Sequence, residues 1–471
     1  MTRPAPLLLL LAGLLFFVAL GNHELQGSTE ARVAGIAMAM HLDNDWVVPR
    51  LFGEPFLEKP PLSLWLDAGA IRLFGASTGA VRLASAFAGL FSVMLLYGML
   101  RRFGRPTSLA FGAALVLATM ASYWSNVRGV GEDALLSLGV TLALLAFYQA
   151  TRPESLPGAN IGTWLLFTLG MAIATLSKGV LGLAMPGIVI FAYLACTSLL
   201  DKRVRPSQWL RPGMFTLLAL VPLFIWLGFL YQRGGMQAVG EVLWTNSVGR
   251  FSGSFVEAGH YEPIYYYLAK LPEAFLPWNI LVYLGLWHFR KSLASNRYLL
   301  FFSLWLVAQF TLLTFASSKR IVYLMALTPA AAVLAAEYGA VLLSRVPAYR
   351  RGLISGVFAV VIACYLGAAI WYAPKADRRE SFVPLTRQIQ AFQAQGHRVV
   401  LYQPNERVAG ATVFYTQNNL PILQTEAQLR AYLDARPGNL ALLDRIEQLT
   451  TPVTALKQIT VGSRPYSFVE Q

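Results

Sequence analysis

The feature that most constrains this chain is a succession of long apolar segments separated by short polar connections. Of its 471 residues, 56% are hydrophobic and only 13% are charged, whereas soluble domains carry about a quarter charged residues. A helix of about 17–25 apolar residues is long enough to cross the hydrocarbon core of a bilayer. The sequence therefore predicts a mainly helical, polytopic membrane protein rather than a set of soluble domains.

Eleven such segments can be delimited, and we interpret each as one transmembrane helix. The first has the length of a signal peptide, but no small-x-small cleavage pattern precedes Gly21, so we interpret it as an uncleaved first span. The predicted spans are 6–21, 78–99, 106–123, 133–151, 161–177, 179–200, 213–231, 273–288, 298–316, 321–343 and 352–372.

The formal charge of +14 is distributed as a topology signal. If the N-terminus is cytoplasmic, five connections also fall in the cytoplasm, and each contains Arg or Lys, as the positive-inside rule requires. These connections are 100–105, 152–160, 201–212, 289–297 and 344–351. No basic stripe interleaved with aromatic residues lies on a soluble face, so no nucleic-acid partner is expected.

Three larger segments fall on the opposite side: the loops 22–77 and 232–272, and the tail 373–471. In the tail, strand-like His397–Tyr402, Ala411–Tyr415 and Leu440–Leu443 alternate with a helical stretch, 425–435, which is typical of a small α/β domain. We therefore predict a transmembrane domain over 1–372 and an extracytoplasmic α/β domain over 373–471.

The first outer loop is longer than a simple connection needs to be, which indicates that it has structure of its own. Glu30 falls in the first turn of a predicted helix that Ser28 or Thr29 can cap. One interpretation is therefore an acidic group that interacts with the helix dipole. The other is a functional carboxylate.

The same loop contains Glu58-Lys59-Pro60-Pro61. The two prolines fix an extended turn and display an adjacent acid and base in front of an amphipathic segment. A rigidly held Lys at a membrane surface suits a phosphate, which it binds as a compact point charge. The alternative is an interfacial Lys that only snorkels to water.

Glu132 and Asp133 open the fourth predicted span. An acid at this position either interacts with the positive end of the helix dipole or is functional, because charge at membrane depth is costly. One interpretation is that Glu132 simply faces water, while Asp133 lies one residue deeper.

Several basic residues fall on the outer side, which the positive-inside rule disfavours. They are Lys59, Lys178, Arg250, Lys319 and Arg320. Their placement predicts an anionic partner, most simply a lipid-linked phosphate. We expect Glu30, Lys59, Asp133, Arg250 and Lys319 to meet in one cavity at the outer leaflet.

Seven short motifs occur in an order that resembles the bacterial relatives of protein O-mannosyltransferases, including the aminoarabinose transferases that modify lipid A. The resemblance covers about residues 20–330. The motifs are Glu30-Ala31-Arg32, Asn44-Asp45-Trp46, Phe56–Leu62 with its Glu-Lys-Pro-Pro-Leu, Asp133, Lys178-Gly179, Arg250-Phe251 with Gly259–Pro263, and Ser318-Lys319-Arg320 followed by Tyr323. One departure is that Thr29 stands where this family usually has a catalytic Asp.

The resemblance implies a GT-C type bundle of about eleven transmembrane helices and a polyprenyl-phosphate sugar donor. It implies Glu30 as a base for the acceptor hydroxyl and Asp133 as a second carboxylate near the acceptor, with inversion at the anomeric carbon. It also implies two further sets of residues. Lys59, Arg250, Lys319, Arg320 and Tyr323 hold the donor phosphate, and Arg32, Glu58, Lys178 and His260 support the site.

No cofactor is predicted with certainty. The resemblance suggests a divalent metal with Glu58 and His260 as weak candidate ligands, but two ligands from distant loops do not define a metal site.

The predicted function is a glycosyltransferase of the bacterial inner membrane that moves a sugar to an envelope acceptor at the periplasmic face. The acceptor is a lipid A-like glycolipid, another glycan or a protein, and the sequence leaves both it and the sugar open. A non-catalytic envelope scaffold or export partner is the alternative, which Thr29 favours. A secondary transporter is less compatible, because such proteins often show internal repeats and none is evident here.

Overall fold

The computed structural model describes residues 4–152, 160–249, 252, 261–347, 352–444, 446, 449–450 and 453–471. Its contacts divide the chain into two compact units. The helical unit comprises Met1–Val18, Glu58–Leu62 and Ser85–Leu366, and the mixed unit comprises Ala19–Leu57, Ser63–Ala84 and Gly367–Gln471. The first outer loop thus shares a unit with the C-terminal segment, and each unit is described by itself.

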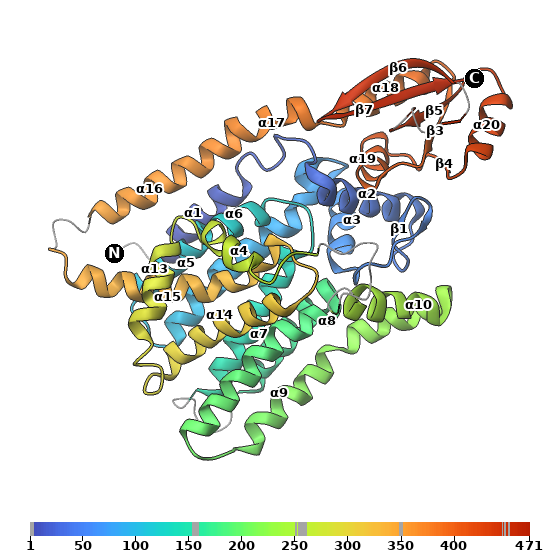
Figure 1. Cartoon of the computed structure of the whole chain (residues 1–471). Helices are drawn as coiled ribbons and strands as arrows, with labels where there is room; N and C mark the ends of the chain where they lie inside the picture. Colours follow the sequence, from blue (N-terminus) through green and yellow to red (C-terminus); the bar gives the residue numbers. More distant parts are fainter. Residues whose placement is uncertain are drawn as a thin grey trace. The chain divides into compact units, whose positions relative to one another are not determined.

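The helical unit is built from helices (Figure 1), most of them apolar. Within it α7 packs along α8, α14 packs on α8 and α15, and α15 also contacts α5 and α13. Its elements are α1 (Pro4–Phe17), α4 (Thr78–Arg102, which begins in the mixed unit), α5 (Thr107–Ala118), α6 (Ala121–Val127), α7 (Asp133–Thr151), α8 (Ile161–Leu200), α9 (Pro206–Ala219), α10 (Val221–Gly240), η1 (Glu241–Gly249), α12 (Tyr266–Ala274), α13 (Asn279–Phe289), α14 (Arg297–Phe315), η2 (Ile321–Leu327), α15 (Thr328–Ser344) and α16 (Gly352–Gly367).

Seven helices in the described part of the chain are long and apolar enough to cross a membrane, and the bent pair α5–α6 makes an eighth if it is one span. The axes of that pair differ by 65°, and two shorter apolar helices, α1 and α13, stand beside them. The mainly helical membrane class predicted from the sequence is confirmed. The element α8 runs for 40 residues, but its helical geometry is interrupted at Lys178 and Gly179, where the sequence places a boundary between two spans.

Arg128, a buried Arg of the helical unit, is matched to backbone carbonyls. The guanidinium of Arg128 donates to the carbonyl oxygens of Leu15, Phe16 and Val18 at 2.9–3.1 Å. The last carbonyls of a helix have no partners within it, and a cation there also matches the negative end of the helix dipole. Arg128 therefore stabilises the C-terminal end of α1.

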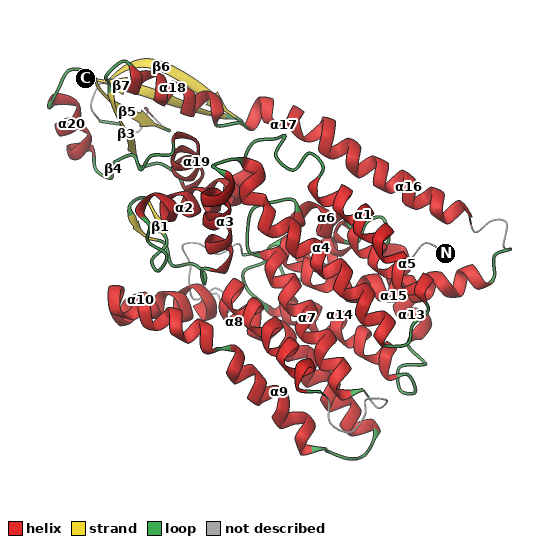
Figure 2. Ribbon diagram, turned by 180° about the vertical axis from the view of Figure 1, so that it is seen from behind, coloured by secondary structure: helices red, strands yellow, loops and turns green. Residues whose placement is uncertain are grey.

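The mixed unit combines helices with a five-stranded sheet of order β4-β3-β5-β7-β6. The strands β3, β4 and β5 are parallel, whereas β7 runs antiparallel to both β5 and β6; Figure 2 shows the sheet in yellow. The elements are α2 (Gly27–Asp43), β1 (Arg50–Leu51), β2 (Glu54–Pro55), α3 (Leu62–Phe74), η4 (Ala368–Tyr372), α17 (Ala373–Glu380), α18 (Val383–Ala394), β3 (Arg398–Tyr402), α19 (Glu406–Thr416), β4 (Ile422–Leu423), α20 (Glu426–Asp434), β5 (Asn439–Leu443), β6 (Thr454–Val461) and β7 (Arg464–Glu470).

One predicted strand of the tail is wrong, because Ala411–Tyr415 lies within helix α19. Asn405 caps this helix, its side-chain oxygen accepting from the backbone N–H of Val408 at 3.1 Å. Val408, Ala411 and Phe414 recur at helical spacing and are buried. The apolar run therefore follows the helical period rather than the two-residue period of a strand.

Helices α2 and α19 approach closely at two glycines. A Cβ built on Gly35 would overlap the backbone of Gly410, and a Cβ on Gly410 would overlap the backbone of Ala31 and Arg32. Since neither obstacle is the end of a flexible side chain, the helices must separate to admit a methyl group. The absence of Cβ atoms allows this packing.

We expect Gly35→Ala to destabilise the protein by about 1–3 kcal/mol, as overpacking does in other tightly packed interiors. Thermal unfolding of the purified protein in detergent measures the effect. Gly69→Ala is the matched control, because Gly69 lies in helix α3 of the same unit and a Cβ there meets nothing within 4 Å. Equal unfolding temperatures for the two variants would contradict the close packing of α2 on α19.

Candidate functional site

Four charged side chains of the helical unit form a largely buried group, the ion-pair cluster, made of Lys59, Glu132, Asp133 and Lys178. The Lys59 ammonium pairs with Oε1 of Glu132. The Lys178 ammonium lies 3.4 Å from the same oxygen and pairs with Oδ1 of Asp133. Glu132 is only 3% exposed and Lys178 only 6%, so the prediction that Glu132 faces water is wrong.

Local sequence explains how each member of the cluster reaches its position. Lys59 precedes Pro60-Pro61, which fix the chain before α3 begins at Leu62. Asp133 is the first residue of α7, where a carboxylate interacts favourably with the helix dipole. Lys178 lies at the break in α8, and Gly179 adopts a φ of +53°, a conformation that favours glycine.

The two lysines of the cluster are surrounded by a larger number of carboxylates. Oε2 of Glu58 lies 3.9 Å from the Lys59 ammonium, so two ammonium groups face three carboxylates. The ring of Tyr323 covers Lys178, with the ammonium 4.2 Å from the ring centroid, a cation–π contact. The structure therefore places Tyr323, predicted from the motif in front of span ten, beside the cluster.

Lys319 has different surroundings from the two lysines of the cluster. Its ammonium donates to the carbonyl oxygens of Ala316 at 2.5 Å and Glu262 at 3.1 Å. Burial lowers the pKa of Lys319 below its usual value, and the negative charge of Glu262 opposes this shift only in part. Among the described residues its hydrogen-bond partners are carbonyl oxygens rather than carboxylates, which leaves its charge available to an anion.

The neighbouring Arg320 is held through its backbone. Its N–H donates to the hydroxyl of Tyr267 at 3.1 Å, and that hydroxyl lies 3.3 Å from the Arg320 carbonyl oxygen. Tyr261 forms an isolated β-bridge with Ser318. These contacts tie the second outer loop to the segment that carries Lys319.

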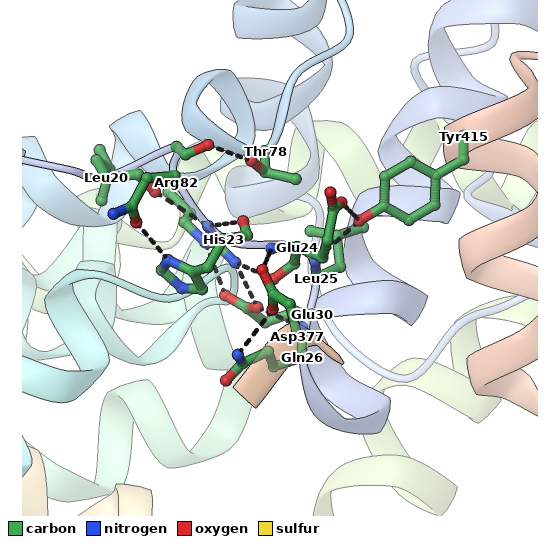
Figure 3. Close-up of polar contacts among 12 residues, drawn as sticks. Leu20, His23, Glu24, Leu25, Gln26, Glu30, Thr78, Arg82, Asp377 and Tyr415 are labelled. Carbon is green, nitrogen blue, oxygen red and sulfur yellow. Dashed lines mark hydrogen bonds and ion pairs between the residues drawn. The ribbon is translucent and has the colours of Figure 1, made fainter. Parts of the chain in front are cut away.

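The mixed unit contains a second buried charge pair, between Glu30 and Arg82 (Figure 3). Nε and Nη2 of Arg82 donate to the two carboxylate oxygens of Glu30 at 3.1 and 2.9 Å, and the backbone N–H of Gln26 donates to Oε2 at 2.8 Å. Such a bidentate pair is among the strongest charge-assisted arrangements. Arg82 is fully buried.

The remaining N–H groups of Arg82 hold the chain that leads into helix α2. Nη1 donates to the carbonyl oxygens of Leu20 and His23, and Nη2 also donates to that of Glu24. Arg82 was not predicted from the sequence as a site residue, although an Arg inside an otherwise apolar predicted span is a signal for a functional or structural partner.

The linker before α2 is also held by the C-terminal part of the mixed unit (Figure 3). Asp377 accepts from the backbone N–H of Glu24 at 2.8 Å and from the side-chain amide of Gln26 at 3.1 Å. The hydroxyl of Tyr415 donates to Glu24 at 2.6 Å and accepts from the N–H of Leu25 at 2.9 Å. Burial raises the pKa of Tyr415, so this phenol stays protonated and can donate at neutral pH.

Helix α2 begins differently from the prediction. Its N-cap is Gln26, which makes no side-chain capping bond, rather than Ser28 or Thr29. Glu30 supplies the missing acceptor by reaching back to the Gln26 N–H. The interpretation of Glu30 as a helix-start acid is therefore confirmed in part, since its carboxylate serves both the helix start and Arg82.

Two other motif residues make structural contacts in the mixed unit. Arg32 pairs with Glu406 at 2.8 Å. Asp45 accepts from the N–H groups of Val47 and Val48 at 3.0 and 3.2 Å, a local turn of the kind that Asp favours. Both residues therefore help to shape the first outer loop.

The remaining predicted site residues cannot be placed in the same way. Arg250 and His260 lie outside the described residues. Within the described ranges, no group of three or more His, Cys, Asp or Glu side chains could hold a metal ion. Because Glu30 and the ion-pair cluster belong to different units, the expected single cavity stays a prediction.

Comparisons with known structures place the fold among GT-C membrane enzymes. ArnT from Cupriavidus metallidurans, solved with bound undecaprenyl phosphate, superposes with a TM-score of 0.78 at 19% identity, covering 98% of this chain and 97% of that chain. The archaeal oligosaccharyltransferase AglB from Archaeoglobus fulgidus gives a TM-score of 0.53 at 12% identity, covering 90% and 64% of the two chains.

Sequence comparisons agree with the fold. The family described as dolichyl-phosphate-mannose-protein mannosyltransferase matches residues 58–226. An undecaprenyl phosphate-α-4-amino-4-deoxy-L-arabinose arabinosyl transferase from Pseudomonas aeruginosa is 30% identical over 68% of this chain. One from Aeromonas hydrophila is 28% identical over 74% of it. The matched regions span 56% and 63% of those relatives. The chain belongs to the GT-C glycosyltransferase family that includes these mannosyl- and aminoarabinosyltransferases.

We expect Arg82→Met to destabilise the protein by about 3–5 kcal/mol, because it leaves the Glu30 carboxylate buried without its cation. The double variant Glu30→Gln/Arg82→Met should be less unstable than the sum of the single variants, with a coupling energy on the order of 1–3 kcal/mol. Denaturant unfolding of the purified protein measures all three.

Arg430→Met is the control for loss of an Arg, since the Arg430 side chain is 52% exposed and pairs with Glu426 on the surface. It should change stability by less than about 0.5 kcal/mol. Additive effects of the Glu30 and Arg82 substitutions would show that the pair is not coupled.

Proposed function

We propose that this chain transfers a sugar from a polyprenyl-phosphate donor to an envelope acceptor at the periplasmic face of a bacterial inner membrane. The observation that carries this proposal is the ion-pair cluster, which holds Lys59 and the buried Lys178 beside carboxylates in an apolar helical unit. The names of the similar relatives point to undecaprenyl phosphate as the lipid and to an aminoarabinose-type sugar. A lipid A-like glycolipid is the acceptor class that fits best.

The proposed reaction breaks the bond between the anomeric carbon and the phosphate oxygen and forms a bond from that carbon to the acceptor oxygen, with inversion. The leaving polyprenyl phosphate gains negative charge as the bond breaks. Nearby cations stabilise that charge and lower the barrier. Lys59, Arg250, Lys319 and Arg320 are the proposed cations, with Tyr323 beside them.

Of the proposed donor-phosphate residues, Lys319 is supported by its surroundings. Its ammonium contacts only carbonyl oxygens among the described residues, so an incoming phosphate needs to displace no carboxylate from it. Lys59, in contrast, must exchange a carboxylate partner for the phosphate.

The two proposed catalytic carboxylates differ in how their oxygens are used. Asp133 pairs with Lys178 through Oδ1, and no described residue donates to its Oδ2. This oxygen is therefore suited to orient an acceptor hydroxyl and to take its proton. Both oxygens of Glu30 accept from Arg82, which fixes the orientation of this carboxylate on α2.

The proposed topology has eleven spans, a cytoplasmic N-terminus and a transmembrane domain over 1–372 with an extracytoplasmic domain over 373–471. The break at Lys178 and Gly179 supports counting α8 as two spans. With α8 counted as two, the seven long apolar helices give eight spans. The bent pair α5–α6 adds one span and the short helices α1 and α13 add one each, which brings the total to eleven.

Transfer is tested with membranes containing the full chain, undecaprenyl-phosphate aminoarabinose and lipid A. We expect Asp133→Asn and Lys59→Met each to lower the transfer rate by about 10²-fold or more, because the first loses the proton acceptor and the second loses a cation at the leaving group. Glu273→Gln is the control and should retain the wild-type rate, since Glu273 is an exposed residue paired with Lys270.

No transfer by the wild-type chain to lipid A or to any other envelope acceptor would favour the scaffold or export partner instead. Full activity of Asp133→Asn would remove this carboxylate from the mechanism.

The topology is tested by labelling single cysteines with a membrane-impermeant maleimide, after Cys196 and Cys364 are replaced by Ser. A cysteine in place of exposed Gln458 should react in intact spheroplasts, because 373–471 is proposed to be periplasmic. A cysteine in place of Ser295, in the connection between α13 and α14, should react only after permeabilisation. The reverse pattern would overturn the proposed orientation.

A further inference from the structure

We propose that Glu132 is a competing carboxylate, which lipid phosphate must displace from Lys59 and Lys178 in order to bind. The inference rests on the proposed function, because it concerns the phosphate of the donor and of the released lipid. It assigns Glu132 a role in setting the affinity for that phosphate, in addition to the donor-phosphate residues named above.

The geometry of the ion-pair cluster is the first argument. The ammonium groups of Lys59 and Lys178 both approach one oxygen, Oε1 of Glu132. Two lysines converging on a single anionic oxygen form the arrangement that a phosphate oxygen also takes between two point charges. Glu132 and a lipid phosphate therefore compete for the same two cations.

The balance of charge is the second argument. The two ammonium groups already face the carboxylates of Glu58, Glu132 and Asp133. A further anion at this depth would be uncompensated, and buried unpaired charge is strongly destabilising. Binding of a phosphate to the lysines therefore requires one carboxylate to withdraw.

Glu132 is the carboxylate best placed to withdraw. It precedes the first residue of α7 and follows Gly131, whose φ of +151° is a conformation that favours glycine. Asp133 lies within the helix and keeps Lys178 paired when Glu132 leaves. Glu58 is more distant from Lys59, at 3.9 Å, and its departure would free only one of the two lysines.

A competing carboxylate has a use in this reaction. The donor and the spent lipid carry the same phosphate, so a site that bound phosphate very tightly would hold its product as well as its substrate. Binding energy that is equal for ground state and transition state does not raise kcat. Glu132 weakens this shared interaction and assists release of the lipid phosphate.

The test measures binding of undecaprenyl phosphate to the purified full chain in nanodiscs, with undecaprenol as the probe that lacks the phosphate. We expect Glu132→Gln to bind undecaprenyl phosphate about tenfold more tightly than the wild type, with binding of undecaprenol unchanged. With donor and acceptor present, the same variant should show a lower KM together with a lower kcat, because release of the lipid is slowed.

Two variants control for folding and for charge. Glu132→Asp retains the negative charge and should bind less tightly than Glu132→Gln. Glu337→Gln removes another buried carboxylate of the helical unit, one that pairs with Arg105, and should leave the affinity for undecaprenyl phosphate unchanged. Unfolding temperatures of all variants verify that the compared proteins are folded.

Equal or weaker binding by Glu132→Gln would overturn the inference, because a carboxylate that only orients the lysines must weaken phosphate binding when it is neutralised. The proposed function fails separately. If the wild type does not bind undecaprenyl phosphate, or if Lys59→Met binds it as well as the wild type, both the donor site and the inference are wrong.

Discussion

The cost of burying charge in an apolar environment is the constraint on which the structure depends. An ammonium group among membrane helices is tolerated only when it has an anionic or well-aligned polar partner. In the helical unit, Lys59 and Lys178 meet this requirement through Glu132 and Asp133. The pairs bring together the loop before α3, the start of α7 and the break in α8, so the groups suited to chemistry also fix these segments.

The mixed unit also buries a cation, the guanidinium of Arg82. Arg82 has five N–H groups in a planar fork, and the structure uses them on the Glu30 carboxylate and on three backbone carbonyls of the linker before α2. A Lys has neither the number of donors nor the geometry to replace it. Asp377 and Tyr415 hold the same linker from the C-terminal segment. The tail of the chain therefore helps to position the helix that carries Glu30.

Part of the candidate site was predictable from the sequence because position alone carries information. Basic residues on the outer side depart from the positive-inside rule, and this departure identified Lys59, Lys178 and Lys319. An acid at the start of an apolar helix identified Asp133. The pattern did not reveal Arg82, or that Glu132 is buried rather than facing water. Both depend on partners distant in the chain, since Arg82 pairs with Glu30, 52 positions away, and Glu132 pairs with Lys59 and Lys178.

The sequence by itself determined the class of the protein, because hydrophobic length and period are local properties that fix which segments become membrane helices. The order of the short motifs likewise determined the family. Only the tertiary structure decided which charges are paired and that Ala411–Tyr415 is helical. Ion pairs and close approaches such as Gly35 on Gly410 arise between segments whose contact no local pattern encodes, and these contacts set the chemistry that each side chain can perform.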